Sequence, residues 1–170
     1  GADAMNAEAN LTYDGTDLTT TSATSQKPVV IIKNTNTDGY GSELNFVKDK
    51  GAAGAADDVI GSIQWYGDNA AQEQVLFSRI MTQISQEADT DEAGLFLIEV
   101  ATSNGSASGL NEGLKIEGTA TTNLLNVEVG HGAASVTTIA GTLTMGTTAT
   151  INNSGVIQVA TQGTIDHDSL

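Results

Sequence analysis

Short apolar segments alternate with polar turn residues through the middle of this chain, from about residue 27 to 118. Within the segments, apolar and polar positions recur with a period close to two, which is typical of β-strands. Turn residues separate them, as at Thr37-Asp38-Gly39, at Gly51–Asp58 and at Asp68-Asn69. Their hairpin-like spacing predicts an antiparallel meander or sandwich rather than βαβ units. The predicted strands are Val29–Asn34, Ser42–Lys48, Val59–Tyr66, Val75–Ser85, Gly94–Thr102 and Gly113–Glu117.

Several of these segments are apolar on both faces. In a strand over Val75–Ser85, two sets of apolar residues lie on opposite faces: Leu76, Ile80 and Ile84 on one, and Val75, Phe77 and Met81 on the other. Two apolar faces in an antiparallel sheet imply a second layer or a partner chain. The competing interpretation is a helix over Ala70–Ile84, in which Val75, Ile80 and Ile84 have nearly helical spacing.

The two ends of the chain have patterns of their own. Near the start, Leu11 and Tyr13 precede an Asp14-Gly15 turn signal and Leu18 follows it, which predicts a hairpin or a corner between short strands. The last third, Gly118–Ile165, consists of short β-type segments broken by Gly, Thr, Asn and Ser, and its charge is limited to Glu128 and His131. It has too few bulky apolar residues to build a core alone, so we expect it to wind with identical chains.

Composition narrows the function classes. Six basic residues against 21 acidic ones give a net charge of −15, which excludes a nucleic-acid partner. The acidic surplus is interpreted as a device that keeps a repetitive β surface soluble. The chain has no cysteine, so disulfides and thiolate chemistry are excluded. No apolar run approaches the roughly 18 to 20 residues of a membrane-spanning helix, so we expect no membrane insertion.

Candidate metal ligands are few. Glu87, Asp89, Asp91 and Glu92 fall in one expected loop and offer the hard oxygen ligands that Ca²⁺ prefers. Near the end, Asp166, His167 and Asp168 could gather around a threefold axis. Neither group has the spacing of an EF-hand loop, and a solvated acidic loop is the favoured interpretation. The weak metal candidates are therefore Asp89, Asp91, Asp166 and Asp168, and we expect no cofactor.

Two adjacent aromatic residues form the candidate receptor contact. In a strand, Trp65 and Tyr66 point to opposite faces, and an exposed aromatic ring can stack on a sugar. The alternative is that both are buried between strands or chains. No catalytic site is predicted, because His131 and His167 are far apart in sequence and the His167–Ser169 pair lacks the surroundings of a nucleophile.

Six segments follow one another in an informative order: Pro28–Asn36, Gly41–Phe46, Ile60–Gly67, Phe77–Ile80, Ala93–Ile98 and Gly113–Gly118. This order resembles the β-rich module of bacteriophage tail fibres and tailspikes. The resemblance covers about ninety residues, and only the order of the pieces is informative. The ending, Gly163–Leu170, resembles a junction in long fibres of marine phages where more shaft follows.

The resemblance implies an elongated all-β homotrimer with an antiparallel module followed by an intertwined shaft resembling a triple β-helix. The implied domains are a hairpin and connector over 1–26, the module over 27–118 and a shaft segment over 119–170 that continues further. It implies a non-enzymatic structural virion component of the phage tail that supports host attachment alongside neighbouring fibre or tail proteins. The alternative is a receptor- or glycan-binding module of a fibre or bacterial trimeric adhesin. The implied trimer-core residues are Leu76, Ile80, Ile84, Leu143, Met145, Ile151, Val156 and Val159.

Overall fold

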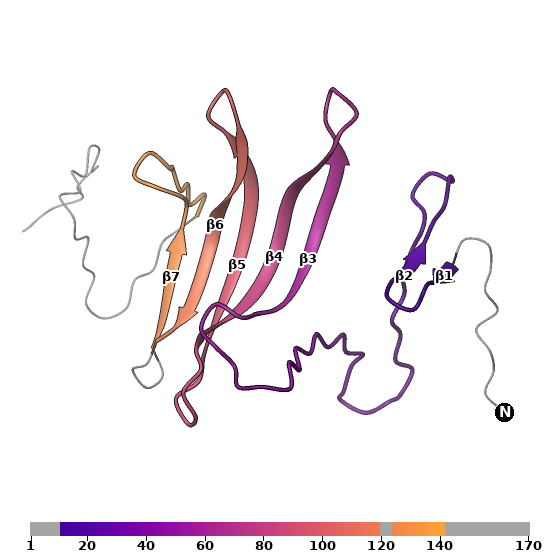
Figure 1. Cartoon of the computed structure of the whole chain (residues 1–170), viewed down its shortest axis with the longest axis horizontal. Coiled ribbons are helices and arrows are strands. Elements are labelled where there is room, and N and C mark those ends of the chain that lie inside the picture. Colours follow the sequence, from indigo (N-terminus) through magenta and orange to yellow (C-terminus); the bar gives the residue numbers. More distant parts are fainter. Residues whose placement is uncertain (1–10, 120–123, 142–170) are drawn as a thin grey trace, which may run out of the picture.

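The computed structural model describes residues 11–119 and 124–141, and this part of the chain is all-β, with no helix (Figure 1). It contains an antiparallel two-stranded sheet and an antiparallel five-stranded sheet. The strands are β1 (Leu11–Tyr13), β2 (Leu18–Thr20), β3 (Val59–Asp68), β4 (Gln74–Gln86), β5 (Ala93–Ser103), β6 (Ser108–Gly118) and β7 (Leu125–Val129).

The five-stranded sheet is a simple meander in which each strand pairs with its neighbours in sequence, in the order β3-β4-β5-β6-β7. Its strands β3 to β6 confirm four of the predicted strands. The helix considered over Ala70–Ile84 is wrong, because β4 pairs along its length with β3 on one side and with β5 on the other. β7 continues the sheet beyond residue 118, and the predicted domain boundary there stays a prediction.

Three of the hairpin turns are built in the same way. A side-chain oxygen of Asp14, Asn69 or Asn104 accepts hydrogen bonds from backbone N–H groups two to four residues further on, at 2.8–3.0 Å. Asp and Asn favour such turns because the short side chain replaces a backbone acceptor. The predicted hairpin at Asp14-Gly15 is confirmed by the β1–β2 pair, and Gly15 has a φ of 99°, a conformation that suits glycine.

Two predicted strands, Val29–Asn34 and Ser42–Lys48, do not form in this structure. Residues 27–50 instead make a long connection between the β1–β2 hairpin and β3, and we call this segment the arm (Figure 1). The prediction rested on apolar alternation, but a strand also needs a neighbour for its backbone groups. In the described part of this single chain no strand pairs with the arm.

The core of the five-stranded sheet is small. Among the described residues, the buried apolar side chains are Met81 and Leu97, which are 6% and 3% exposed. They lie directly opposite each other on β4 and β5, in the centre of the sheet. Glu99, two residues after Leu97 on the same face of β5, is also buried. The sheet therefore buries little of its apolar surface by itself.

Candidate functional site

The register of the five-stranded sheet separates charged from uncharged side chains. Directly paired residues share a face, and alternate residues along a strand lie on opposite faces. Every charged residue within β4 to β7 falls on the face of Met81 and Leu97, which we call the charged face. The other side, the uncharged face, is formed by Gly61, Ile63, Trp65, Ser78, Ile80, Thr82, Ile84, Gly94, Phe96, Ile98, Val100, Asn111, Leu114, Ile116, Gly118, Leu125, Val127 and Val129.

On the charged face, both basic side chains of β4 to β7 are paired with carboxylates. The guanidinium of Arg79 donates to both carboxylate oxygens of Glu99, from Nη2 at 3.2 Å and from Nε. These hydrogen bonds raise the pKa of Arg79, against an opposing effect of burial. Lys115 lies beside Glu117 and Glu128, at 3.0 and 3.3 Å, and the hydrogen bonds to these carboxylates raise its pKa. Arg79 and Lys115 are thus paired with three carboxylates of this face, and a fourth, Glu112, lies directly opposite Glu99.

The uncharged face has no comparable cover. One row of directly paired residues crosses all five strands and is entirely aliphatic: Ile63, Ile80, Ile98, Leu114 and Val129. Side chains of this face are exposed at both edges and in the middle of the sheet, with Ile63 43%, Val100 50% and Val127 59% exposed. A contiguous apolar patch of this kind is characteristic of an interaction surface.

Part of the arm covers one end of the uncharged face. Phe46 lies against Gly61, where a Cβ would come within 2.7 Å of the Cβ of Phe46, so this contact depends on glycine. Beyond the arm, in the turn before β3, Gly54 lies over Ile84, with 3.2 Å between the position of a Cβ and Cδ1 of Ile84. Over β7, Leu125, Val127 and Val129 of this face stay 57–68% exposed.

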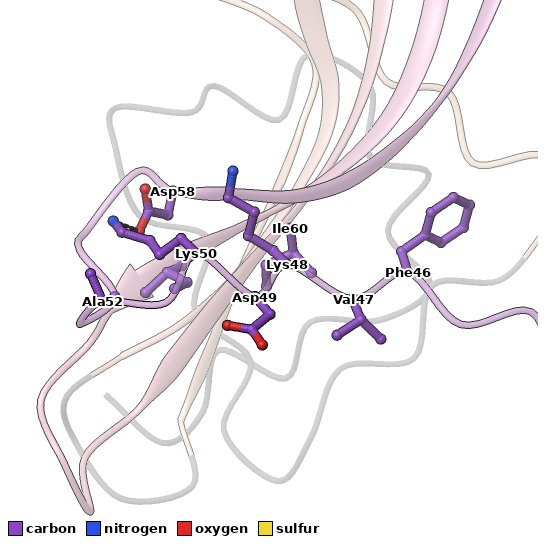
Figure 2. Close-up of a pocket in the computed structure, with 10 residues that line it drawn as sticks. Phe46, Val47, Lys48, Asp49, Lys50, Ala52, Asp58 and Ile60 are labelled. Carbon is purple, nitrogen blue, oxygen red and sulfur yellow. Dashed lines mark hydrogen bonds and ion pairs between the residues drawn. The ribbon is translucent and has the colours of Figure 1, made fainter. Parts of the chain in front are cut away.

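Between Phe46 and Ile84 lies an open pocket of about 370 Å³ (Figure 2). At its edge, Asp58 accepts hydrogen bonds from Lys50 Nζ at 2.6 Å and from the backbone N–H of Ala55 at 2.9 Å. The hydrogen bond from Lys50, and then that from Ala55, lower the pKa of Asp58. These hydrogen bonds fix the turn that leads from the arm into β3.

The candidate receptor residues lie on different faces of β3. Trp65 shares the uncharged face with Ile63, whereas Tyr66 lies on the same face of β3 as Gln64. The Tyr66 hydroxyl donates a hydrogen bond to Oε1 of Gln64 at 2.7 Å. Both rings are about half exposed in the single chain, Trp65 at 48%. The role of these residues in receptor contact stays a prediction.

The weak metal candidates Asp89 and Asp91 lie in the turn between β4 and β5. In this turn, the N–H of Asp91 donates to the carbonyl of Ala88 at 2.9 Å. No group of three or more His, Asp or Glu residues that could hold a metal ion occurs within residues 11–119 and 124–141. Asp166 and Asp168 lie outside the described residues.

The implied trimer-core residues do not all lie on one face. Ile80 and Ile84 lie on the uncharged face, as their spacing predicted. A bulge in β4 opposite Trp65 and Tyr66 breaks the alternation, so Leu76 pairs with Tyr66 and leaves the face of Ile80. The other members lie outside the described residues: Leu143, Met145, Ile151, Val156 and Val159.

Comparison with protein-family models, curated proteins and solved structures gave no significant match. Within the described ranges, no helix is long and apolar enough to cross a membrane.

Proposed function

We propose that this chain is a structural segment of a bacteriophage tail fibre, acting as a homotrimer that supports host attachment and has no chemistry of its own. The observation that carries the proposal is the uncharged face, an apolar surface left half open beside a core of few buried side chains. The phage assignment, the trimer and a virion location in the tail rest on the resemblance of segments such as Pro28–Asn36 and Ile60–Gly67 to tail-fibre modules.

Burial of the exposed apolar side chains of the uncharged face favours assembly. A fully buried Ile or Val side chain contributes about 1.5–3 kcal/mol, and most of this is forgone where the side chain stays exposed. When identical chains cover the uncharged face, its side chains become buried and contribute this free energy, and no charged residue of the sheet is brought into the contact. In a chain of net charge −15, an interface free of charges is the one that copies can share at the least electrostatic cost. Residues 119–170 would extend the same assembly as a β-shaft.

The test is the solution mass of the purified chain by light scattering during size-exclusion chromatography. The proposal expects three times 17.4 kDa, unchanged on dilution through the micromolar range. A folded monomer at all concentrations would refute it, because a face that stays open in solution is not an assembly surface.

The second candidate is a receptor- or glycan-binding module of a fibre or adhesin, and the half-exposed Trp65 favours it. An aromatic ring open to solvent can stack on a sugar. Here the test is a whole-cell or glycan binding assay with wild type and Trp65→Ala. Binding that disappears in a Trp65→Ala protein of unchanged mass would support this candidate, and a trimer without binding would support the structural role alone.

A further inference from the structure

We infer that the arm of one copy, residues 27–50, lies on the uncharged face of a second copy. This inference rests on the proposed assembly and names what covers the open part of the face. It concerns the half of the face over β5 to β7, where Ile98, Leu114 and Val129 form one apolar row with Ile80. The occupant is the apolar stretch Val29–Ile32 of the neighbouring arm.

The arm contains an exposed apolar stretch that is stabilised by contact with an apolar surface. Val29, Val30, Ile31 and Ile32 are consecutive, and they are 53–77% exposed in the single chain. Since successive side chains of an extended segment point in opposite directions, this stretch is apolar on both sides. One surface alone cannot bury both sides, so such a stretch fits between two layers.

A contact within the same chain shows that the arm and the uncharged face are compatible. Phe46, near the end of the arm, already lies on this face at Gly61. Upstream of Phe46, the arm runs away from β3 and towards the β1–β2 hairpin, on the side opposite to β7 (Figure 1). The arm thus extends beyond the β3 edge of its own sheet (Figure 1), while Val127 and Val129 at the β7 edge stay 59% and 57% exposed. A second copy can receive Val29–Ile32 there.

Charge also favours an exchange between copies. The arm holds four of the six basic residues of the chain, Lys27, Lys33, Lys48 and Lys50, against three acidic ones, Asp38, Glu43 and Asp49. It is thus slightly basic in a protein of net charge −15. A basic arm reduces the repulsion between copies when it lies across a neighbour. The apolar stretch Val29–Ile32 meets a face that carries no charged side chain, so no charged group loses its water of hydration in this contact.

Because the chain has no cysteine, site-directed cross-linking tests this contact without background thiols. Two full-length variants with different affinity tags, Val30→Cys and Val127→Cys, are co-expressed and treated with a short bismaleimide. The matched control pairs Val30→Cys with Gln64→Cys, a position that is also exposed but lies on the charged face of β3. Since each chain has a single thiol, a product that carries both tags reports a contact between copies.

The inference expects the mixed-tag product from Val30→Cys with Val127→Cys at several times the yield of the control pair. Equal yields, or no mixed product from a protein whose mass is that of a trimer, would overturn the arm exchange and leave the proposed assembly standing. A monomeric wild type would overturn both. A second variant, Val30→Asp with Ile31→Asp, should lower the association constant at least tenfold while the β-sheet circular dichroism is unchanged. Undiminished association in that variant would also contradict the exchange.

Discussion

A single negative charge placed on either face of β3 separates the assembly hypothesis from a self-contained sheet. The matched variants are Ile63→Glu, on the uncharged face, and Gln64→Glu, on the charged face. The two positions are adjacent in the same edge strand and both are exposed in the single chain. Gln64→Glu keeps the oxygen that accepts the Tyr66 hydroxyl and lies directly opposite Arg79, so it is a mild change.

The expected effects differ by several kcal/mol. In an isolated sheet, either substitution at an exposed strand position changes the free energy of unfolding by within about 1 kcal/mol. In an assembly closed over the uncharged face, the exposed 43% of Ile63 becomes buried, which contributes about 0.6–1.3 kcal/mol per copy. Burying a carboxylate there costs several kcal/mol more in each copy. Over three copies the loss exceeds about 5 kcal/mol, which is more than about a thousandfold in the association constant.

The assay is sedimentation velocity over a concentration series, with circular dichroism to confirm that each variant keeps its β-structure. Ile63→Glu should sediment as a monomer under conditions where wild type and Gln64→Glu sediment as trimers. If Ile63→Glu associates as tightly as Gln64→Glu, the uncharged face is open to solvent in the assembly and the reasoning about burial is refuted.

Three further predictions concern the stability of the folded chain. Arg79→Leu leaves the buried Glu99 without its partner and should lower the free energy of unfolding by about 3 kcal/mol in urea, with most of the loss restored by adding Glu99→Leu; a fully stable single variant would contradict the pairing argument. Gly61→Ala places a Cβ 2.7 Å from Phe46 and should cost about 1–3 kcal/mol, whereas the same change in a Phe46→Ala background should cost almost nothing; equal costs in both backgrounds would show that the contact is absent. The pKa of Asp58 is lowered below its ordinary 3.8, chiefly by Lys50 and also by Ala55, so its contribution to stability is present above that pH and is lost as the pH falls through the lower folded pKa. The protection factor of the Ala55 amide, its exchange rate relative to the intrinsic rate at each pH, should fall in that acidic window in wild type and stay constant across it in Asp58→Asn, and identical profiles would refute the bond.

Much of the fold was predictable because each strand and each turn of a hairpin sheet has a pattern within its own short segment of sequence. The alternation in Val59–Tyr66 and Gly94–Thr102, with turn residues between strands, located β3 and β5 to within two residues at each end. β6 begins five residues earlier than predicted, at Ser108, because its polar first half resembles a loop and becomes a strand only by pairing with β5.

The rest depends on register, which no single segment contains. Arg79 and Glu99 are twenty residues apart and meet only because β4 and β5 pair at that position. The placement of all charged residues of β4 to β7 on one face likewise requires a bulge in β6. At this bulge Gly113 is left without a directly paired residue, and Glu112 lies opposite Glu99. The arm failed as a strand prediction for the opposite reason: its pattern is β-like, but the neighbour that a strand needs is missing from the described part of the chain.

The meander topology has a consequence for the order of folding events. Because every strand of the five-stranded sheet pairs only with its neighbours in sequence, its contacts close short loops, and such sheets fold faster than those that need distant pairings. In the proposed assembly, joining copies over the uncharged face is a separate, bimolecular event. Refolding from denaturant should therefore show an early phase whose rate ignores protein concentration, followed by a later phase that accelerates in proportion to it.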